Sequence, residues 1–149
     1  DYHEEKGQGL PYYIKMINEK EYIYKDHFAP HDIEVTEFGN GKTRREVATQ
    51  LGLRFKVVPK IPLEDGIHAT TMMLPRCWID VEHCKSLIDA LRHYHRKYID
   101  KNRMFRSKPV HDWSSHACDA MRYLAVGLQE LNTRQSAPQS VADNEYRII

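Results

Sequence analysis

The segment between residues 22 and 58 constrains the fold most, because its proline and glycine residues leave room only for short elements. Residues 22–28 carry aromatic and β-branched side chains typical of a strand, which Pro30 ends because proline has no N–H to donate. Residues 43–51 have the capping-box start and the following glycine of a helix. Residues 55–58 form a second short strand. Strand, helix and strand in this order predict a parallel βαβ unit and an α/β fold.

The remaining chain is mostly helical in pattern. Apolar spacing predicts further helices at residues 10–19, 63–74, 82–99 and 114–131. A short strand is expected at 77–80, and the basic connector 101–108 is a candidate hairpin. The final residues are polar and without pattern, which is typical of a mobile tail. We therefore expect one domain over residues 1–131 and a flexible C-terminal tail over residues 132–149.

Composition excludes several classes of protein. The 149 residues suffice for one domain with a core. No apolar run approaches the roughly 20 residues that span a bilayer, and the acidic start is not a signal peptide, so neither a membrane protein nor a secreted one is expected. The net charge of +1 does not indicate nucleic-acid binding by itself, but metal-binding carboxylates offset a local basic stripe.

The three cysteines, Cys77, Cys84 and Cys118, predict buried free thiols. An odd number without a secretory signal is typical of a reducing compartment. Nearby histidines make a zinc site the alternative, but there is no Cys-x-x-Cys pair and the spacings match no common finger.

Residues 39–43 read Gly-Asn-Gly-Lys-Thr and end like a phosphate-binding loop. The full motif needs a glycine where Thr36 stands, so a nucleotide site is not predicted. A turn followed by a capped helix explains the same residues. Lys42, Arg44 and Arg45 at this helix start are candidates for binding DNA phosphates.

Two aspartates are candidates for a metal site. Asp32 follows the end of a strand, where ligands gather in open α/β sheets, although a turn-capping role explains it as well. Asp119 lies in mid-helix, where aspartate is a poor helix former. It shares a helix face with Asp112, His116 and Tyr123, and is either an ion-paired structural carboxylate or a metal ligand. Aspartates on two elements suit Mg²⁺ or Mn²⁺, which prefer oxygen ligands.

Six segments recur in an order that is specific to one family. They are residues 24–32, 38–44, 57–59, 64–67, 74–80 and 111–123, the last of which reads HDWSSHACDAMRY. In this order they resemble the nuclease domain of phage terminase large subunits. The resemblance covers about residues 1–131.

This resemblance implies an RNase H-like fold, a mixed β-sheet flanked by helices, that cuts double-stranded DNA with two Mg²⁺ or Mn²⁺ ions. It implies that Asp32 is the second acidic metal ligand and Asp119 the third. Asp112 and His116 become candidates for a supplementary ligand or a proton relay. The implied partners are an N-terminal packaging ATPase domain of the same protein, the portal and the small terminase subunit, in the host cytoplasm during viral assembly.

The resemblance also implies that the fold is truncated at its N-terminus. The family's first acidic residue lies on a strand that precedes the segment matching Asp1, so that strand is expected to be absent, as are the ATPase motifs.

Two other functions fit the same residues. One is another RNase H-like nuclease, of the resolvase or integrase kind. The other is a non-catalytic module of the packaging motor that binds DNA or the portal. In each case the connector 101–108 is a candidate for DNA contact through Arg103 and Arg106, because it leads directly into the helix of Asp119.

Overall fold

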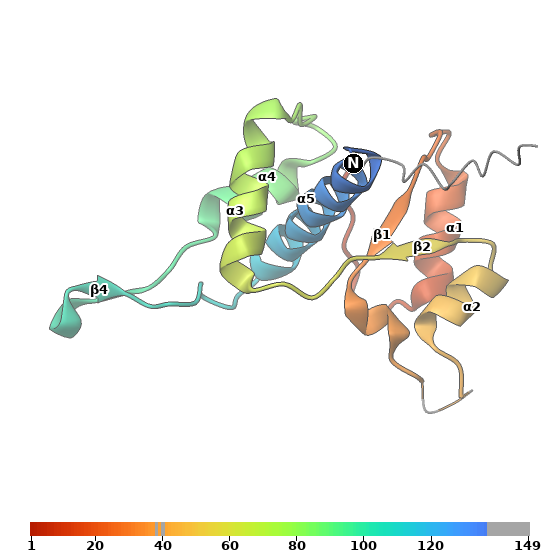
Figure 1. The fold of residues 1–149 in the computed structure, drawn as a ribbon, viewed down its shortest axis with the longest axis horizontal. Helices are drawn as coiled ribbons and strands as arrows, with labels where there is room; N and C mark the ends of the chain where they lie inside the picture. Colours follow the sequence, from red (N-terminus) through yellow and green to blue (C-terminus); the bar gives the residue numbers. More distant parts are fainter. Residues whose placement is uncertain (38, 40, 137–149) are drawn as a thin grey trace, which may run out of the picture.

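The computed structural model describes residues 1–136 except 38 and 40, and Figure 1 shows their arrangement. The elements are α1 Leu10–Glu19, β1 His27–Ala29, η1 His31–Glu34, α2 Arg44–Gln50, β2 Phe55–Val57, α3 Leu63–Met73, η2 Leu74–Arg76, α4 Lys85–His93, β3 Tyr98–Ile99, η3 Asp100–Asn102, β4 Met104–Phe105 and α5 Ser115–Ser136. Helix α5 runs between α3 and α4 on one side and the unit of β1, β2, α1 and α2 on the other. None of the described helices is long and apolar enough to cross a membrane.

The parallel βαβ unit is confirmed. β1 pairs with β2 in parallel, with His27 opposite Phe55. In the predicted capping box, the Thr43 hydroxyl accepts the Glu46 N–H at 3.1 Å and the Glu46 carboxylate accepts the Thr43 N–H at 2.7 Å. Gly52 follows α2 with φ +89°, a left-handed backbone that favours glycine at a helix end.

Two apolar clusters form the interior. The smaller one joins α1 to α2 through Ile14, Ala48 and Leu53. The larger one lies where α3 and α4 pack on α5, and it contains Val58, Ala69, Met73, Cys84, Leu87, Ala90, Ala117, Cys118, Met121, Ala125 and Val126. Beyond Met121, α5 buries Ala125 and Val126 and leaves Leu124 and Leu128 exposed.

Helix α5 contacts β1 closely at Gly127. A Cβ atom at Gly127 would lie 2.6 Å from Cδ1 of the Phe28 ring, so only glycine permits this approach without a shift. Phe28 in turn packs against the larger cluster. The contact fixes α5 across the strand that leads into η1.

A large mixed sheet of the RNase H kind is not formed by the described residues. They form one parallel and one antiparallel sheet, each of two strands. The strand predicted at 77–80 is absent: the Trp78 side chain is fully exposed, and the Asp80 carboxylate accepts the N–H groups of Glu82 and His83, each at 2.9 Å. Asp80 therefore stabilises a turn at the place where a strand was predicted.

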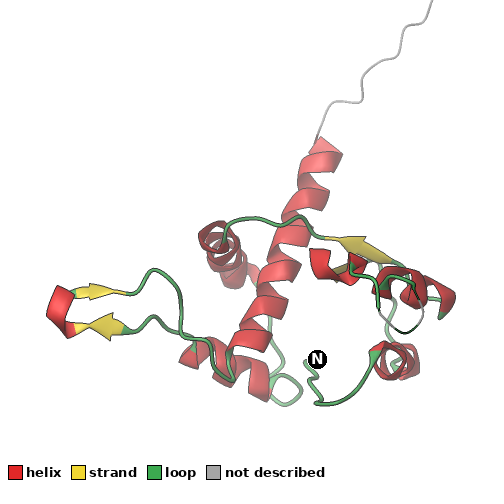
Figure 2. Ribbon diagram, turned by 90° about the horizontal axis from the view of Figure 1, so that it is seen from below, coloured by secondary structure: helices red, strands yellow, loops and turns green. Residues whose placement is uncertain are grey.

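The basic connector forms a hairpin, as predicted. Helix α4 ends at His93 rather than at residue 99, and the chain continues into an arm, residues 97–108, that projects from the rest of the molecule (Figures 1 and 2). β3 and β4 pair in antiparallel fashion with Tyr98 opposite Phe105. At the turn, Arg103 has a left-handed backbone with φ +48°.

Helix α5 is longer than predicted. It continues to Ser136, five residues beyond the expected domain boundary at residue 131. The first part of the expected tail is therefore helical, and residues 137–149 lie outside the described part of the chain.

Replacing Gly127 by alanine is expected to destabilise the protein by about 1–2 kcal/mol, measured by urea unfolding. Repulsion between the new methyl group and Phe28 outweighs the roughly 1 kcal/mol that alanine gains over glycine within a helix. In a Phe28→Ala background the obstacle is gone, so the same replacement is expected to be neutral or stabilising. An equal loss in both backgrounds would contradict the contact.

Candidate functional site

Asp119 faces an open pocket of about 540 Å³ between α5 and the residues around β1. His116, Asp119 and Tyr123 line it together, which confirms that these three residues share a helix face. Asp112, predicted on the same face, precedes α5 and does not line this pocket. From the β1 side, Asp26 and His27 complete the polar lining.

The Asp119 carboxylate is ion-paired with Arg122. Arg122 Nη2 and Nε lie 2.9 and 3.3 Å from Asp119 Oδ1. The Arg122 side chain is only 13% exposed and passes Gly66 of α3, where a Cβ atom would lie 2.7 Å from its Cγ. Its guanidinium also lies 4.7 Å from the centre of the Tyr123 ring. Asp119 is thus oriented by a partly buried cation, while 42% of its own side chain remains exposed.

Asp26 is a pocket residue that the sequence did not reveal. It was assigned to the interior of a longer strand, whereas β1 begins only at His27. The Asp26 side chain is 13% exposed and its Oδ1 lies 2.5 Å from Lys56 Nζ. An acidic residue directly before an apolar strand was the signal available, but its proximity to α5 depends on tertiary packing.

Asp32 lies apart from this lining. It belongs to η1, just after β1, and is exposed; it does not line the pocket of Asp119. Asp26 and Asp119 both already pair with cations. Around this pocket, no three of the described acidic, histidine or cysteine donors come within 4.8 Å of one another. As arranged, these residues do not fit the implied two-ion Mg²⁺ or Mn²⁺ site.

Asp112 is held by the turn that begins α5. Its Oδ1 accepts the Ser114 hydroxyl at 2.6 Å and the Ser114 N–H at 2.9 Å. Its Oδ2 lies 3.2 Å from Nε2 of His93 at the end of α4. The Ser114 hydrogen bonds, and then the proximity of His93, hold the pKa of Asp112 below its usual value.

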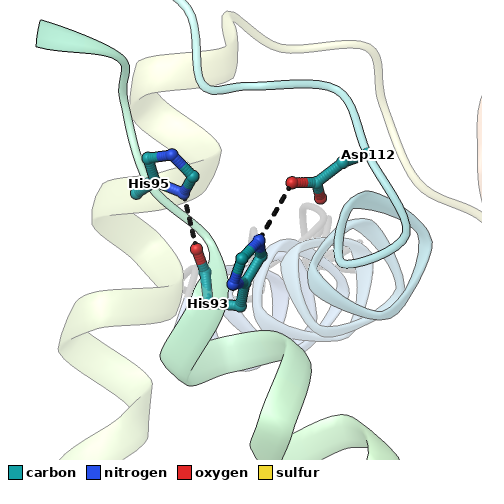
Figure 3. Close-up of side chains that lie close together, drawn as sticks. All are labelled: His93, His95 and Asp112. Carbon is teal, nitrogen blue, oxygen red and sulfur yellow. Dashed lines mark hydrogen bonds and ion pairs between the residues drawn. The ribbon is translucent and has the colours of Figure 1, made fainter.

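Asp112 also belongs to a group of metal-binding side chains. One donor atom each of His93, His95 and Asp112 lies within 4.8 Å of the others (Figure 3). His95 Nδ1 lies 2.7 Å from the His93 carbonyl oxygen, which holds the His95 ring beside the end of α4. This is the only such group of three or more donors in the part of the chain that the structure describes.

The cysteines are free thiols, as predicted. Cys84 and Cys118 are buried, whereas Cys77 is partly exposed. Burial, with the negative charges of Asp119 and Asp112, raises the pKa of the Cys118 thiol to about 11. This thiol therefore stays protonated at neutral pH, which disfavours a role as nucleophile or metal ligand.

The basic residues at the start of α2 are already paired. Arg44 Nε lies 3.3 Å from Glu37 and Arg45 Nη1 lies 2.7 Å from Glu34, while Lys42 donates to Gln50 at 3.1 Å. The two ion pairs reduce the positive charge that Arg44 and Arg45 present to phosphates.

The basic residues of the arm, unlike those at the start of α2, have side chains that are exposed and unpaired among the described residues. Residues 97–108 contain five basic residues and one acidic residue, Asp100. Within the described chain, the side chains of Lys101, Arg103 and Arg106 form no ion pair or hydrogen bond, and all three are exposed. Tyr98 and Phe105 pack edge to face across the hairpin, with ring centres 5.1 Å apart. The arm is thus an exposed cationic element joined to the N-terminal end of α5.

Three comparisons with known proteins gave no match. No protein-family model matches the chain, and no match was found among curated proteins or solved structures.

Replacing Ser114 by alanine is expected to raise the pKa of Asp112, measured by NMR titration of its carboxyl carbon in metal-free buffer. A depressed folded-state pKa stabilises the fold at neutral pH, and this contribution is lost as pH falls through that pKa. The wild type should therefore be more stable than S114A at pH 7, with a difference that shrinks in acid.

Ser115→Ala is the matched control. The Ser115 hydroxyl bonds the Asp112 backbone N–H at 3.0 Å and makes no contact with the carboxylate. This variant should leave the Asp112 pKa unchanged. The same rise in both variants would contradict the assignment to Ser114.

Proposed function

We propose that this chain is a DNA-cutting domain of the terminase large-subunit kind, a hydrolase acting on phosphodiester bonds. The observation that carries the proposal is the pocket at the N-terminal half of α5, where Asp119 and His116 face Asp26. Asp119 and His116 come from the segment with the strongest resemblance to the terminase nuclease, residues 111–123.

The charge of the arm supports the same proposal. It precedes α5 by a few residues in the chain, and its exposed Arg103 and Arg106 suit contact with the phosphates of a duplex. Phosphate contacts of this kind position a duplex without reading its sequence. The substrate is then double-stranded DNA, as the resemblance implies.

One pocket residue, His116, is placed for proton transfer in phosphodiester hydrolysis. In this reaction a water oxygen bonds to phosphorus and loses a proton, while the bond from phosphorus to the 3′ oxygen breaks and that oxygen gains a proton. His116 is exposed beside Asp119, where an imidazole can accept a proton from water or donate one to the leaving oxygen. Asp32 and Asp119 do not line one pocket, so they do not form the ligand pair that the resemblance implies for Mg²⁺ or Mn²⁺.

A second candidate is a non-catalytic DNA-binding module of a packaging motor. The ion pairs of Asp26 with Lys56 and of Asp119 with Arg122 favour it, since both pocket carboxylates already have counter-charges. The unpaired cations of the arm serve either function equally well.

Asp119→Asn is expected to lower the rate of plasmid cutting by about 100-fold or more in buffer with Mn²⁺ or Mg²⁺. Asp89→Asn, an exposed aspartate on α4, is the matched control and should cut like the wild type. Circular dichroism checks that both variants fold. Undiminished cutting by D119N rejects the nuclease assignment, and DNA binding without any cutting by the wild type favours the second candidate.

Charge reversal of the arm, Arg103→Glu with Arg106→Glu, is expected to weaken DNA binding at every sequence tested. The slope of log K against log salt should flatten by about 2, because two phosphate contacts are lost. Lys6→Glu with Lys15→Glu makes the same change in net charge at exposed sites away from the arm. Equal weakening by both pairs would show a general charge effect and would contradict contact by the arm.

A further inference from the structure

We propose that His93, His95 and Asp112 bind one transition-metal ion of the zinc type at the base of the arm. The site is separate from the Asp119 pocket and does not depend on the proposed nuclease function. Figure 3 shows its construction: the two histidines come from the end of α4 and the residues after it, and Asp112 comes from the loop before α5.

The spacing of the donors suits a tetrahedral ion. Ligand bonds of about 2.0–2.1 Å place two ligands of a tetrahedral centre about 3.3 Å apart. His93 Nε2 and Asp112 Oδ2 are already 3.2 Å apart. One nitrogen of His95 lies within 4.8 Å of both, and rotation of this exposed ring away from the His93 carbonyl completes the set.

Neighbouring groups orient these ligands as they do in zinc proteins. Metal-bound imidazoles usually donate their other N–H to a carbonyl or carboxylate, and bound carboxylates accept further hydrogen bonds. The hydrogen bond from His95 Nδ1 to the His93 carbonyl holds this ring beside the end of α4. Nδ1 lies on the side of the ring toward His93 and Asp112, so binding of an ion by Nε2 requires the ring to rotate (Figure 3). Ser114 occupies Oδ1 of Asp112 and leaves Oδ2 directed at His93. The His93 ring also packs on Trp113, with ring centres 4.9 Å apart.

The donor types select the metal. Two imidazoles and one carboxylate suit Zn²⁺ and similar transition-metal ions, whereas Mg²⁺ and Ca²⁺ prefer oxygen ligands alone. Three protein ligands leave the fourth position to water, since the group is exposed on one side.

A bound ion would join the two legs of the arm. His93 and His95 precede the arm, and Asp112 follows it. The last backbone link between the legs is the hydrogen bond from the Val110 N–H to the His95 carbonyl at 2.9 Å. Bonds from one ion to both legs would replace the contact between His93 and Asp112 by a stronger link and restrain the arm relative to α4 and α5.

The experiment titrates ZnCl₂ into the full chain, without a polyhistidine tag and after chelator treatment, by isothermal titration calorimetry. We expect one equivalent to bind, and His95→Asn to weaken binding at least about tenfold. His83→Asn is the matched control, because exposed His83 also pairs with a carboxylate, Asp80, at 3.1 Å but has no second histidine. CoCl₂ should give visible absorption bands in the wild type and H83N that are absent in H95N.

A structural readout separates the site from adventitious binding. Zinc should slow hydrogen exchange in residues 97–108 of the wild type and H83N, and leave exchange in H95N unchanged. Equal zinc affinity of the wild type and H95N, or equal affinity of the wild type for Mg²⁺, overturns the proposal. Because D119N retains all three ligands, it should bind zinc like the wild type, so failure of the nuclease assignment leaves this test unaffected.

Discussion

The close packing of α5 against β1 and α3 is the constraint on which the other features depend. Gly127 lets the helix approach the Phe28 ring, and Gly66 lets the Arg122 side chain pass between α3 and α5. Together these contacts set both the position and the rotation of α5. Its first turns therefore present Asp119 to the pocket, and the preceding loop brings Asp112 to the end of α4.

The net charge of the chain is near zero, but paired and unpaired charged groups lie in different parts of the fold. Each acidic group around α5 meets a cation or a donor: Asp119 meets Arg122, Asp26 meets Lys56, and Asp112 meets Ser114 and His93. The cations of the arm have no such partners within the described chain. Burial near the helix favours pairing, because an unpaired charge there would lose hydration, whereas the arm is solvated along its length.

Local sequence signals predicted local structure well. The capping box, the glycine after α2 and the helical period that aligns Asp119 with His116 act within a few residues, so they could be read directly. The prediction of a strand at 77–80 was wrong, because the Asp80 carboxylate accepts the backbone N–H groups of the residues two and three positions after it and so stabilises a turn. Two other arrangements arise from packing between elements that are remote in sequence, which no local pattern encodes. Asp26 lines the same pocket as Asp119, and His93 contacts Asp112.

The left-handed residue at the turn of the arm has an energetic consequence. Arg103, with φ +48°, occupies a conformation that costs a residue with a Cβ atom about 1–2 kcal/mol and glycine almost nothing. The turn of the hairpin thus has a strained backbone at a residue whose side chain is a guanidinium. Among the described residues, Arg103 is the only residue other than glycine with a positive φ, so the backbone strain of this kind lies at the turn of the projecting arm.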